Sequence, residues 1–164
     1  MSRQFIFKHY WWMALLGAVL GIVLVVICRT GQRAPLVGSI IAAALGFCYF
    51  AQQQKLAEMS LFKELFTEFN RRYDNLDERL RQIANSGKPP DEPACQAIIE
   101  YYNLCGEEYL FFSEGYIHRE AWRSWCAGML WYFEREPFRS MWEKENATNS
   151  YYGLSLDIIR RGAA

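Results

Sequence analysis

Residues 56–86 read LAEMSLFKELFTEFNRRYDNLDERLRQIANS, and this stretch decides the fold of the chain. Its apolar side chains recur at alternating spacings of three and four residues: Met59, Phe62, Phe66, Phe69, Tyr73, Leu76, Leu80 and Ile83. Such spacing places them along one face of an α-helix as a heptad seam, with charged residues between its members. Because neither Gly nor Pro interrupts the stretch, we predict one long helix that continues from the apolar segment before it.

A second seam of the same period follows a short loop. Gly87, Pro89 and Pro90 end the long helix, and Asp91 is a suitable N-cap for the next one. That helix carries apolar residues at the same spacings: Cys95, Ile98, Tyr102, Cys105, Tyr109 and Phe112. Two matching seams joined by a short loop favour an antiparallel hairpin within the chain, and a parallel coiled coil between subunits is the alternative. Five members of the first seam are therefore candidates for packing or oligomerisation: Phe62, Phe66, Phe69, Tyr73 and Leu76.

The rest of the chain predicts shorter helices. Gly115 ends the helix that Asp91 begins, and residues 119–134 form another, with Trp and Cys residues along one face. A break at Pro137 precedes a short helix, and residues 154–161 add a last one before an unstructured Gly-Ala-Ala end. No alternating strand pattern occurs, so we expect an all-α fold with a helical bundle over residues 52–161.

Two uncharged segments precede the bundle. Residues 10–28 read YWWMALLGAVLGIVLVVIC, and residues 34–51 read APLVGSIIAAALGFCYFA. Each is close to the roughly 20 residues of a membrane-spanning helix, and the aromatic residues that open the first favour a membrane interface. A cleaved signal peptide is disfavoured, because no small-residue cleavage site follows the first segment. We therefore predict a basic tail over residues 1–9 and a transmembrane hairpin over residues 10–51, with the lipid bilayer as a partner.

The charge of the chain is divided unequally along its length. Residues 1–57 hold five basic residues and no acidic one, whereas residues 58–164 hold 13 basic and 18 acidic residues. The two parts therefore carry +5 and −5, and their sum hides the difference. Positive residues concentrate on the cytoplasmic side of a membrane, which favours a multi-pass protein of the bacterial inner membrane with both termini in the cytoplasm. Since the bundle is acidic, we expect no nucleic-acid partner.

Small residues recur at four-residue spacing in both uncharged segments. They are Gly17 and Gly21 in the first segment, followed in the second by Gly38, Ala42 and Gly46. Residues four apart share one helical face, where small side chains let two backbones approach closely. The spacing predicts that the two spans pack on each other, or that one face mediates oligomerisation.

Aromatic residues are abundant in the bundle, with fifteen between residues 90 and 152. They either fill the bundle or extend to a protein partner or the lipid headgroups. The candidates for such a surface are Trp131, Tyr132, Trp142, Tyr151 and Tyr152.

No motif predicts a catalytic centre. The chain has no Gly-rich phosphate loop, no HExxH and no nucleophile elbow, so we expect neither an enzyme nor a cofactor. Three cysteines of the bundle with His118 make a Cys₃His zinc site an alternative, disfavoured by their scattered spacing: Cys95, Cys105 and Cys126.

Charged residues gather on both sides of Gly115. Glu107, Glu108 and Glu114 precede it, and Arg119, Glu120 and Arg123 follow it. If the helices turn back at Gly115, these charges meet at the tip of the hairpin as an ion-pair network. A carboxylate-based active site and an anion site at Arg119 and Arg123 are the alternatives.

Residues 98–109, IIEYYNLCGEEY, resemble a segment of an uncharacterised bacterial family of small membrane-anchored helical proteins. The runs Gly115-Tyr116-Ile117 and Trp125-Cys126-Ala127-Gly128, with Trp122, extend the resemblance over residues 60–145. It implies an all-α domain behind a membrane anchor, and it implies no known activity or site residue.

These observations lead to one principal hypothesis of function. It is a membrane-anchored scaffold or adaptor that acts through protein contacts, as a homo-oligomer or with a protein partner. An oligomeric pore-type effector of a defence or stress system is the alternative, and an unrecognised enzyme using Glu107, Glu108 or His118 is a second one. No Asp, Glu, Lys, Arg or His lies within either predicted span, which disfavours the pore.

Overall fold

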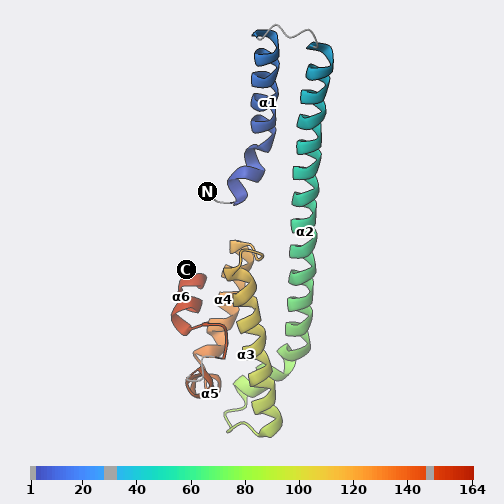
Figure 1. Cartoon of the computed structure of the whole chain (residues 1–164). Helices are drawn as coiled ribbons and strands as arrows, with labels where there is room; N and C mark the ends of the chain where they lie inside the picture. The colour runs from blue at the N-terminus through green and yellow to red at the C-terminus, as the bar shows by residue number, and fades with distance from the viewer. Residues whose placement is uncertain (1–2, 28–32, 147–149) are drawn as a thin grey trace. The chain divides into compact units, whose positions relative to one another are not determined.

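A computed structural model describes residues 3–27, 33–146 and 150–164 (Figure 1). Within these ranges the chain forms six helices and no strands, which confirms the all-α prediction. The helices are α1 (Arg3–Ile27), α2 (Arg33–Asn85), α3 (Glu92–Ser113), α4 (Arg119–Phe133), α5 (Phe138–Glu145) and α6 (Leu156–Ala163). The chain divides into two compact units, residues 1–60 and residues 61–164, and α2 contributes to both.

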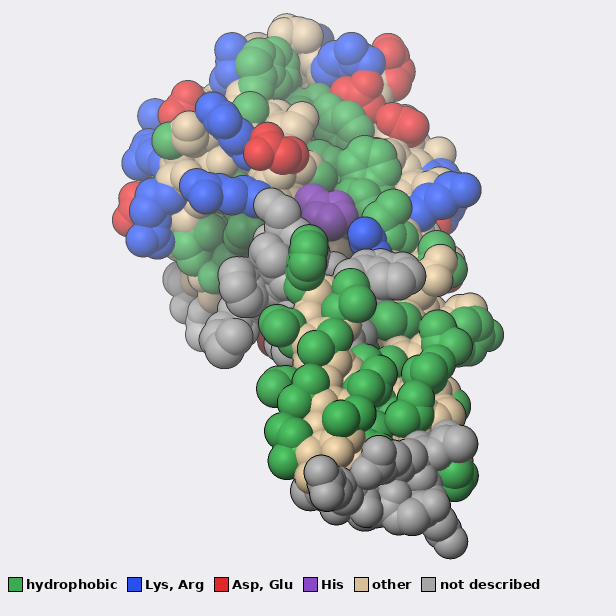
Figure 2. Space-filling view, turned by 90° about the horizontal axis from the view of Figure 1, so that it is seen from above, with side chains coloured by type: hydrophobic (Ala, Val, Ile, Leu, Met, Phe, Trp, Pro, Cys, Tyr) green, Lys and Arg blue, Asp and Glu red, His purple; other side chains and the backbone are tan. Residues whose placement is uncertain are grey.

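The first unit exposes apolar side chains along α1 and the first part of α2. Leu20 is 61% exposed and Leu45 is 65% exposed. Figure 2 shows hydrophobic side chains over this unit, whereas Lys, Arg, Asp and Glu side chains cover much of the second unit. The two helices touch at Gly21, where an added Cβ would lie 3.2 Å from Ile40 Cδ1.

Among the described helices, α2 alone is long and apolar enough, from Pro35 onward, to cross a membrane. Within the described structure, 6% of the most apolar 18-residue stretch of this helix is buried. The side chains of residues 10, 11, 13 and 14 lie outside those described, and the described apolar stretch of α1, Leu15–Ile27, is by itself shorter than a crossing requires. Cys28, which ends the first predicted span, lies outside the described residues. The described chain therefore holds one candidate span where the sequence predicts two.

In the second unit the last part of α2 runs antiparallel to α3. Contacts pair increasing residue numbers in α2 with decreasing ones in α3: Phe69 with Phe111, Tyr73 with Tyr101, and Arg79 with Pro93. From Phe69 to Ile83 the heptad seam thus packs within the chain, as the favoured hairpin predicts, whereas Met59 at its start is 57% exposed.

Local sequence signals set the ends of α3. The side chain of Asp91 accepts a hydrogen bond from the Ala94 amide at 2.9 Å, which satisfies an amide that the first turn leaves free. At the other end Gly115 takes a positive φ of 82°, and its amide donates to the Phe112 carbonyl at 2.9 Å. Glycine adopts this left-handed conformation without strain, so the chain turns there toward α4.

The core of the bundle is aromatic. Eight of the fifteen aromatic residues between positions 90 and 152 are buried: Tyr101, Tyr102, Trp122, Tyr132, Phe133, Phe138, Trp142 and Tyr151. The Tyr102 hydroxyl donates to the Phe138 carbonyl, which gives the most buried tyrosine a polar partner and ties α3 to α5. Most of the aromatic excess therefore fills the bundle.

The last helix extends further than the sequence predicts. Its N-cap, Ser155, accepts a hydrogen bond from the Ile158 amide at 3.3 Å, and α6 continues to Ala163. An added Cβ at Gly162 would overlap Cys126 Sγ and lie 2.7 Å from Trp122 Nε1. The prediction of an unstructured Gly-Ala-Ala end is wrong, because the missing side chain of Gly162 lets α6 approach α4 closely.

Candidate functional site

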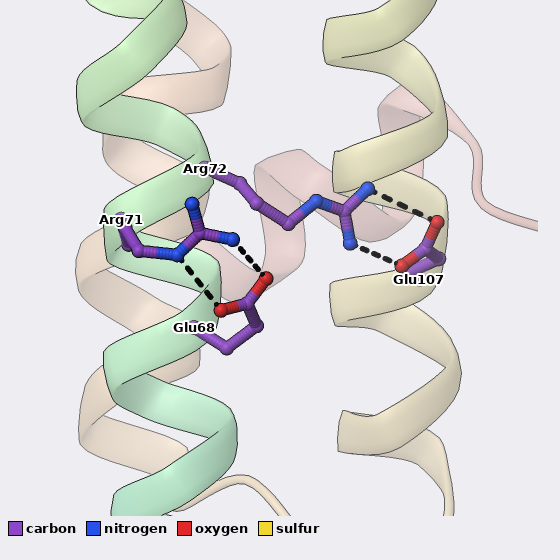
Figure 3. Close-up of polar contacts among 4 residues, drawn as sticks. All are labelled: Glu68, Arg71, Arg72 and Glu107. Atoms are coloured by element: carbon purple, nitrogen blue, oxygen red, sulfur yellow. Dashed lines mark hydrogen bonds and ion pairs between the residues drawn. The ribbon is translucent and has the colours of Figure 1, made fainter.

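Two adjacent arginines of α2 make different ion pairs (Figure 3). Arg72 forms a two-pronged pair across to α3, with Nη1 2.5 Å from Glu107 Oε2 and Nη2 3.2 Å from Oε1. Arg71 pairs along its own helix with Glu68, at 2.6 Å and 2.9 Å, and both of these side chains are exposed. Neighbouring positions on a helix point about 100° apart, so only Arg72 can join α2 to α3.

Glu108 is the one buried charged residue among the described residues, with 6% of its surface exposed. Burial raises the pKa of its carboxyl to about 8, against the lowering effect of the nearby Arg72 charge and with a further rise from Glu107. Near neutral pH this side chain is therefore largely protonated. Glu107, next to it in sequence, is instead half-buried and paired with Arg72.

The thiols near Glu108 are also held neutral. Burial raises the pKa of Cys105 well above its ordinary value and that of Cys126 to about 12, and the Glu108 charge adds to both shifts. A thiol reacts as a nucleophile through its thiolate, so these two cysteines behave as small apolar core residues.

A polar cluster ties α2 to α4 around Asp77. Its Oδ1 accepts hydrogen bonds from the Tyr73 hydroxyl at 2.9 Å and the Tyr132 hydroxyl at 3.3 Å, and its Oδ2 pairs with Arg81. Burial raises the pKa of the Tyr73 and Tyr132 hydroxyls, so both remain donors at neutral pH. The cluster satisfies the polar ends of two core tyrosines.

A surface pocket opens beside α3, α4 and α6, with a cavity volume of about 480 Å³. Three arginines line it, Arg119 and Arg123 from α4 and Arg161 from α6, together with one acid, Glu120. Its apolar lining includes Phe112 and Trp122, whose rings stack with centroids 4.7 Å apart. This pocket has both the volume and the mixed lining of a small-ligand site.

The charges around Gly115 do not form the predicted network. Among the described residues Glu107 pairs with Arg72 of α2 instead, and no ion pair is found for Arg119, Glu120 or Arg123. The register between α2 and α3 brings Arg72 opposite Glu107. The first charged residues of α4 instead line a pocket together with residues of α3 and α6. The pocket nevertheless joins Arg119 and Arg123, the pair from which an anion site is an alternative prediction.

The small residues of the first unit lie in different surroundings. Gly21 meets Ile40, whereas Gly17, Gly38 and Gly46 have open space where a Cβ would lie, and Ala42 is exposed. Gly21 is thus the position where the described residues show close packing between α1 and α2.

The seam candidates lie against the bundle. Phe69 and Leu76 belong to its buried core, and Tyr73 contacts Tyr101. Phe62 lies edge-on to His118 at 4.2 Å, and Phe66 stacks on Trp125 at 5.7 Å.

Three of the five residues predicted for a partner surface are core residues. Tyr132, Trp142 and Tyr151 are 3–4% exposed, so that prediction is wrong for them. Trp142 contacts Tyr102 and Phe133 inside the bundle, which places it on the inner face of α5. Trp131 and Tyr152 do reach the surface, at 39% and 57% exposure.

The remaining chemical candidates are not brought together. His118 is exposed at the N-cap of α4 and makes no side-chain capping bond there. No group of three His, Cys, Asp or Glu side chains in the described part of the chain could hold a metal ion, so the zinc alternative is wrong for Cys95, Cys105, Cys126 and His118.

Sequence reasoning missed two contributors to the pocket. Arg161 and Gly162 belong to α6, and the prediction places Gly162 in an unstructured end. Ser155 followed by two apolar residues at 158 and 159 was an available signal for a capped amphipathic helix.

Comparison with known proteins identifies no relative: no protein family, curated protein or solved structure matches the chain. The resemblance to a family of membrane-anchored helical proteins therefore stays a prediction.

Proposed function

We propose that the chain is a membrane-anchored helical scaffold or adaptor of a bacterial cell membrane, acting through protein–protein contacts. The observation that carries the proposal is the apolar surface of the first unit, where residues such as Leu20, Leu24 and Leu45 are more than 60% exposed. Exposing that surface to water costs about 25 cal/mol per Å², whereas lipid removes the cost. The bundle has its own core and a charged surface, which suits water.

The proposed membrane arrangement has two spans. The candidate span in α2 pairs with α1 through the contact between Gly21 and Ile40. Arg3 and Lys8 in the first turns of α1, and Lys55 and Lys63 along α2, favour a cytoplasmic location for both termini.

Oligomerisation is the part of the proposal that glycine positions support. Gly38 and Gly46 of α2 face open space, and small residues four or eight apart allow the backbone of a second helix to approach. Leu56 and Met59, further along α2, are more than half exposed and offer apolar surface to a second copy.

Membrane fractionation tests the anchor. We expect the full chain to stay with membranes after an alkaline carbonate wash, and a C-terminal reporter that works only in the cytoplasm to be active. Release into the wash would contradict the anchor, and an inactive reporter in an intact membrane would contradict the topology.

Crosslinking in native membranes tests the contacts. We expect discrete oligomers or one defined partner, and loss of the oligomer in a Gly38→Ile, Gly46→Ile variant. Leu45→Ile, on the same helix, is the matched control and should crosslink normally. A monomer without a partner would contradict the scaffold, and dye leakage from vesicles holding the purified chain would favour the pore-type alternative.

A further inference from the structure

The pocket beside α3, α4 and α6 has unpaired positive charge. Arg119 and Arg123 lie four residues apart, on one face of α4, and Arg161 of α6 lines the same pocket. Within the described residues no ion pair or hydrogen bond is found for the guanidinium groups of Arg119 and Arg123. Among the described residues, Arg161 donates one hydrogen bond, to the Asp157 carbonyl at 3.3 Å, so most of its donors are also available.

The close approach of α6 to α4 brings these arginines into one pocket. Gly162 lies directly on Cys126 and Trp122 of α4, and Arg161 is its neighbour in sequence. The two helices lie side by side in the bundle (Figure 1). Three positive side chains therefore line one cavity from two sides, with Glu120 as the one acidic side chain among its lining residues.

The N-terminus of α4 adds to the positive potential. α4 begins at Arg119, and its N-cap residue, His118, provides no side-chain acceptor for the free amides of the first turn. Free amides at a helix N-terminus carry partial positive charge and favour anions. This effect acts in the same direction as the three arginines.

The other part of the lining is apolar and aromatic. Trp122 is 2% exposed and stacks on the half-buried Phe112 at 4.7 Å. A ligand that fills about 480 Å³ therefore meets an apolar lining as well as charge.

We propose that this pocket binds an organic phosphate, in which a phosphate group pairs with the arginines and an apolar body rests on the aromatic residues. Guanidinium groups bind phosphate oxygens through paired, charge-assisted hydrogen bonds. A cluster of several arginines therefore favours a phosphate dianion over a ligand that carries one carboxylate. A phospholipid headgroup and a soluble organic phosphate share this chemistry. The site does not depend on the scaffold function proposed above.

Calorimetric titration of the full chain in a neutral detergent tests the site, with phenyl phosphate as the probe. We expect saturable binding that weakens as salt rises, and at least a tenfold loss of affinity in each of Arg123→Gln and Arg161→Gln. Glu120→Gln should bind phenyl phosphate more tightly, because it removes an opposing charge from the pocket lining. A general loss of structure would not produce that gain.

Matched controls define the result that would overturn the proposal. Arg139→Gln removes an exposed arginine of α5 outside the pocket lining, and affinity should not change. Circular dichroism and thermal unfolding of each variant show that the bundle remains folded. Absence of binding at about 10 mM phenyl phosphate, tenfold above the Kd of a weak site of about 1 mM, would overturn the proposal, as would equal affinity in folded Arg123→Gln.

Three further probes establish the ligand class. Inorganic phosphate should bind more weakly than phenyl phosphate, and equal affinity would overturn the role of the aromatic residues. Benzoate should also bind more weakly, and equal affinity would overturn the preference for phosphate. The last probe is soluble short-chain phosphatidic acid, with phosphatidylcholine of the same chain length as its control. Tighter binding of phosphatidic acid than of phenyl phosphate identifies a lipid ligand, and tighter binding of phenyl phosphate identifies a soluble one.

Discussion

The two units of the chain use the same apolar residue types in opposite ways. In residues 1–60, Leu20 and Leu45 are more than 60% exposed, whereas in residues 61–164 Phe133 is 1% exposed. Removing a large apolar side chain from water stabilises a protein by roughly 1.5–3 kcal/mol. A water-soluble unit therefore rarely leaves a whole face of such side chains exposed. The surroundings that each unit requires therefore follow from where its apolar side chains lie.

Truncating one apolar side chain in each unit, Phe133 and Leu20, should change the stability of the bundle very differently. Phe133→Ala should lower the free energy of unfolding of the bundle by about 3–5 kcal/mol, because it removes a fully buried ring and leaves a cavity. Leu20→Ala should leave bundle unfolding unchanged. Denaturant unfolding of the full chain in neutral detergent, followed by near-ultraviolet circular dichroism, measures both. Similar losses in the two variants would contradict the different surroundings of the two side chains.

A pair of glycines tests how closely the bundle is packed. Gly162→Ala should destabilise the bundle by about 1–3 kcal/mol, because its Cβ would overlap Cys126 Sγ. Gly128→Ala is the control: it lies in α4 with open space around it, so alanine should raise stability by about 0.5–1 kcal/mol. Thermal unfolding of both variants checks the opposite signs, and a stabilising Gly162→Ala would show that α6 does not approach α4 closely.

The buried carboxyl of Glu108 makes the stability of the bundle depend on pH. Its pKa is raised by burial from about 4.5 to about 8, so the folded state binds the proton more tightly than the unfolded state. The contribution of Glu108 to the free energy of unfolding is therefore fully present below about pH 4.5. It falls by up to about 1.4 kcal/mol per pH unit as the pH rises toward 8. Glu108→Gln should remove this fall and be the more stable protein at pH 8.5. Parallel pH profiles would contradict the burial of the carboxylate.

The smallest expected effect concerns the ion pairs of α2. A double-mutant cycle with Arg72→Gln and Glu107→Gln should give a coupling of about 1 kcal/mol or less, since both side chains are about one-third exposed. The same cycle on Arg71 and Glu68 should give no measurable coupling, because both lie on the open surface. Added salt should weaken the first coupling. A larger coupling for Arg71 with Glu68 than for Arg72 with Glu107 would contradict the greater burial of the second pair.

Much of the fold could be predicted because its signals are local. Asp91, Gly87 and Gly115 act through their own backbone and cap hydrogen bonds, so the ends of α2 and α3 follow from a few residues. The seam from Phe69 to Ile83 reveals the buried face of α2 by its period alone, although the same period also includes the exposed Met59.

The candidate site was only partly predictable because it depends on contacts between distant segments. Arg119 and Arg123 stand out by spacing, but Arg161 joins them through the contact of Gly162 with Cys126. The pairing of Arg72 with Glu107 requires the register between α2 and α3, which the seam period leaves open. Tyr132 and Trp142 look like surface candidates until the rotation of α4 and α5 about their own axes is known.

The thiol beneath α6 offers a way to time the opening of that helix. Cys126 is fully buried under Gly162, and its pKa of about 12 leaves almost no thiolate at neutral pH. A thiol reagent should therefore modify Cys126 only in molecules whose α6 has momentarily lifted. The half-buried Cys95, at the start of α3, provides the reference rate in the same molecule. The ratio of the two labelling rates would measure how often α6, which forms one side of the pocket, separates from α4.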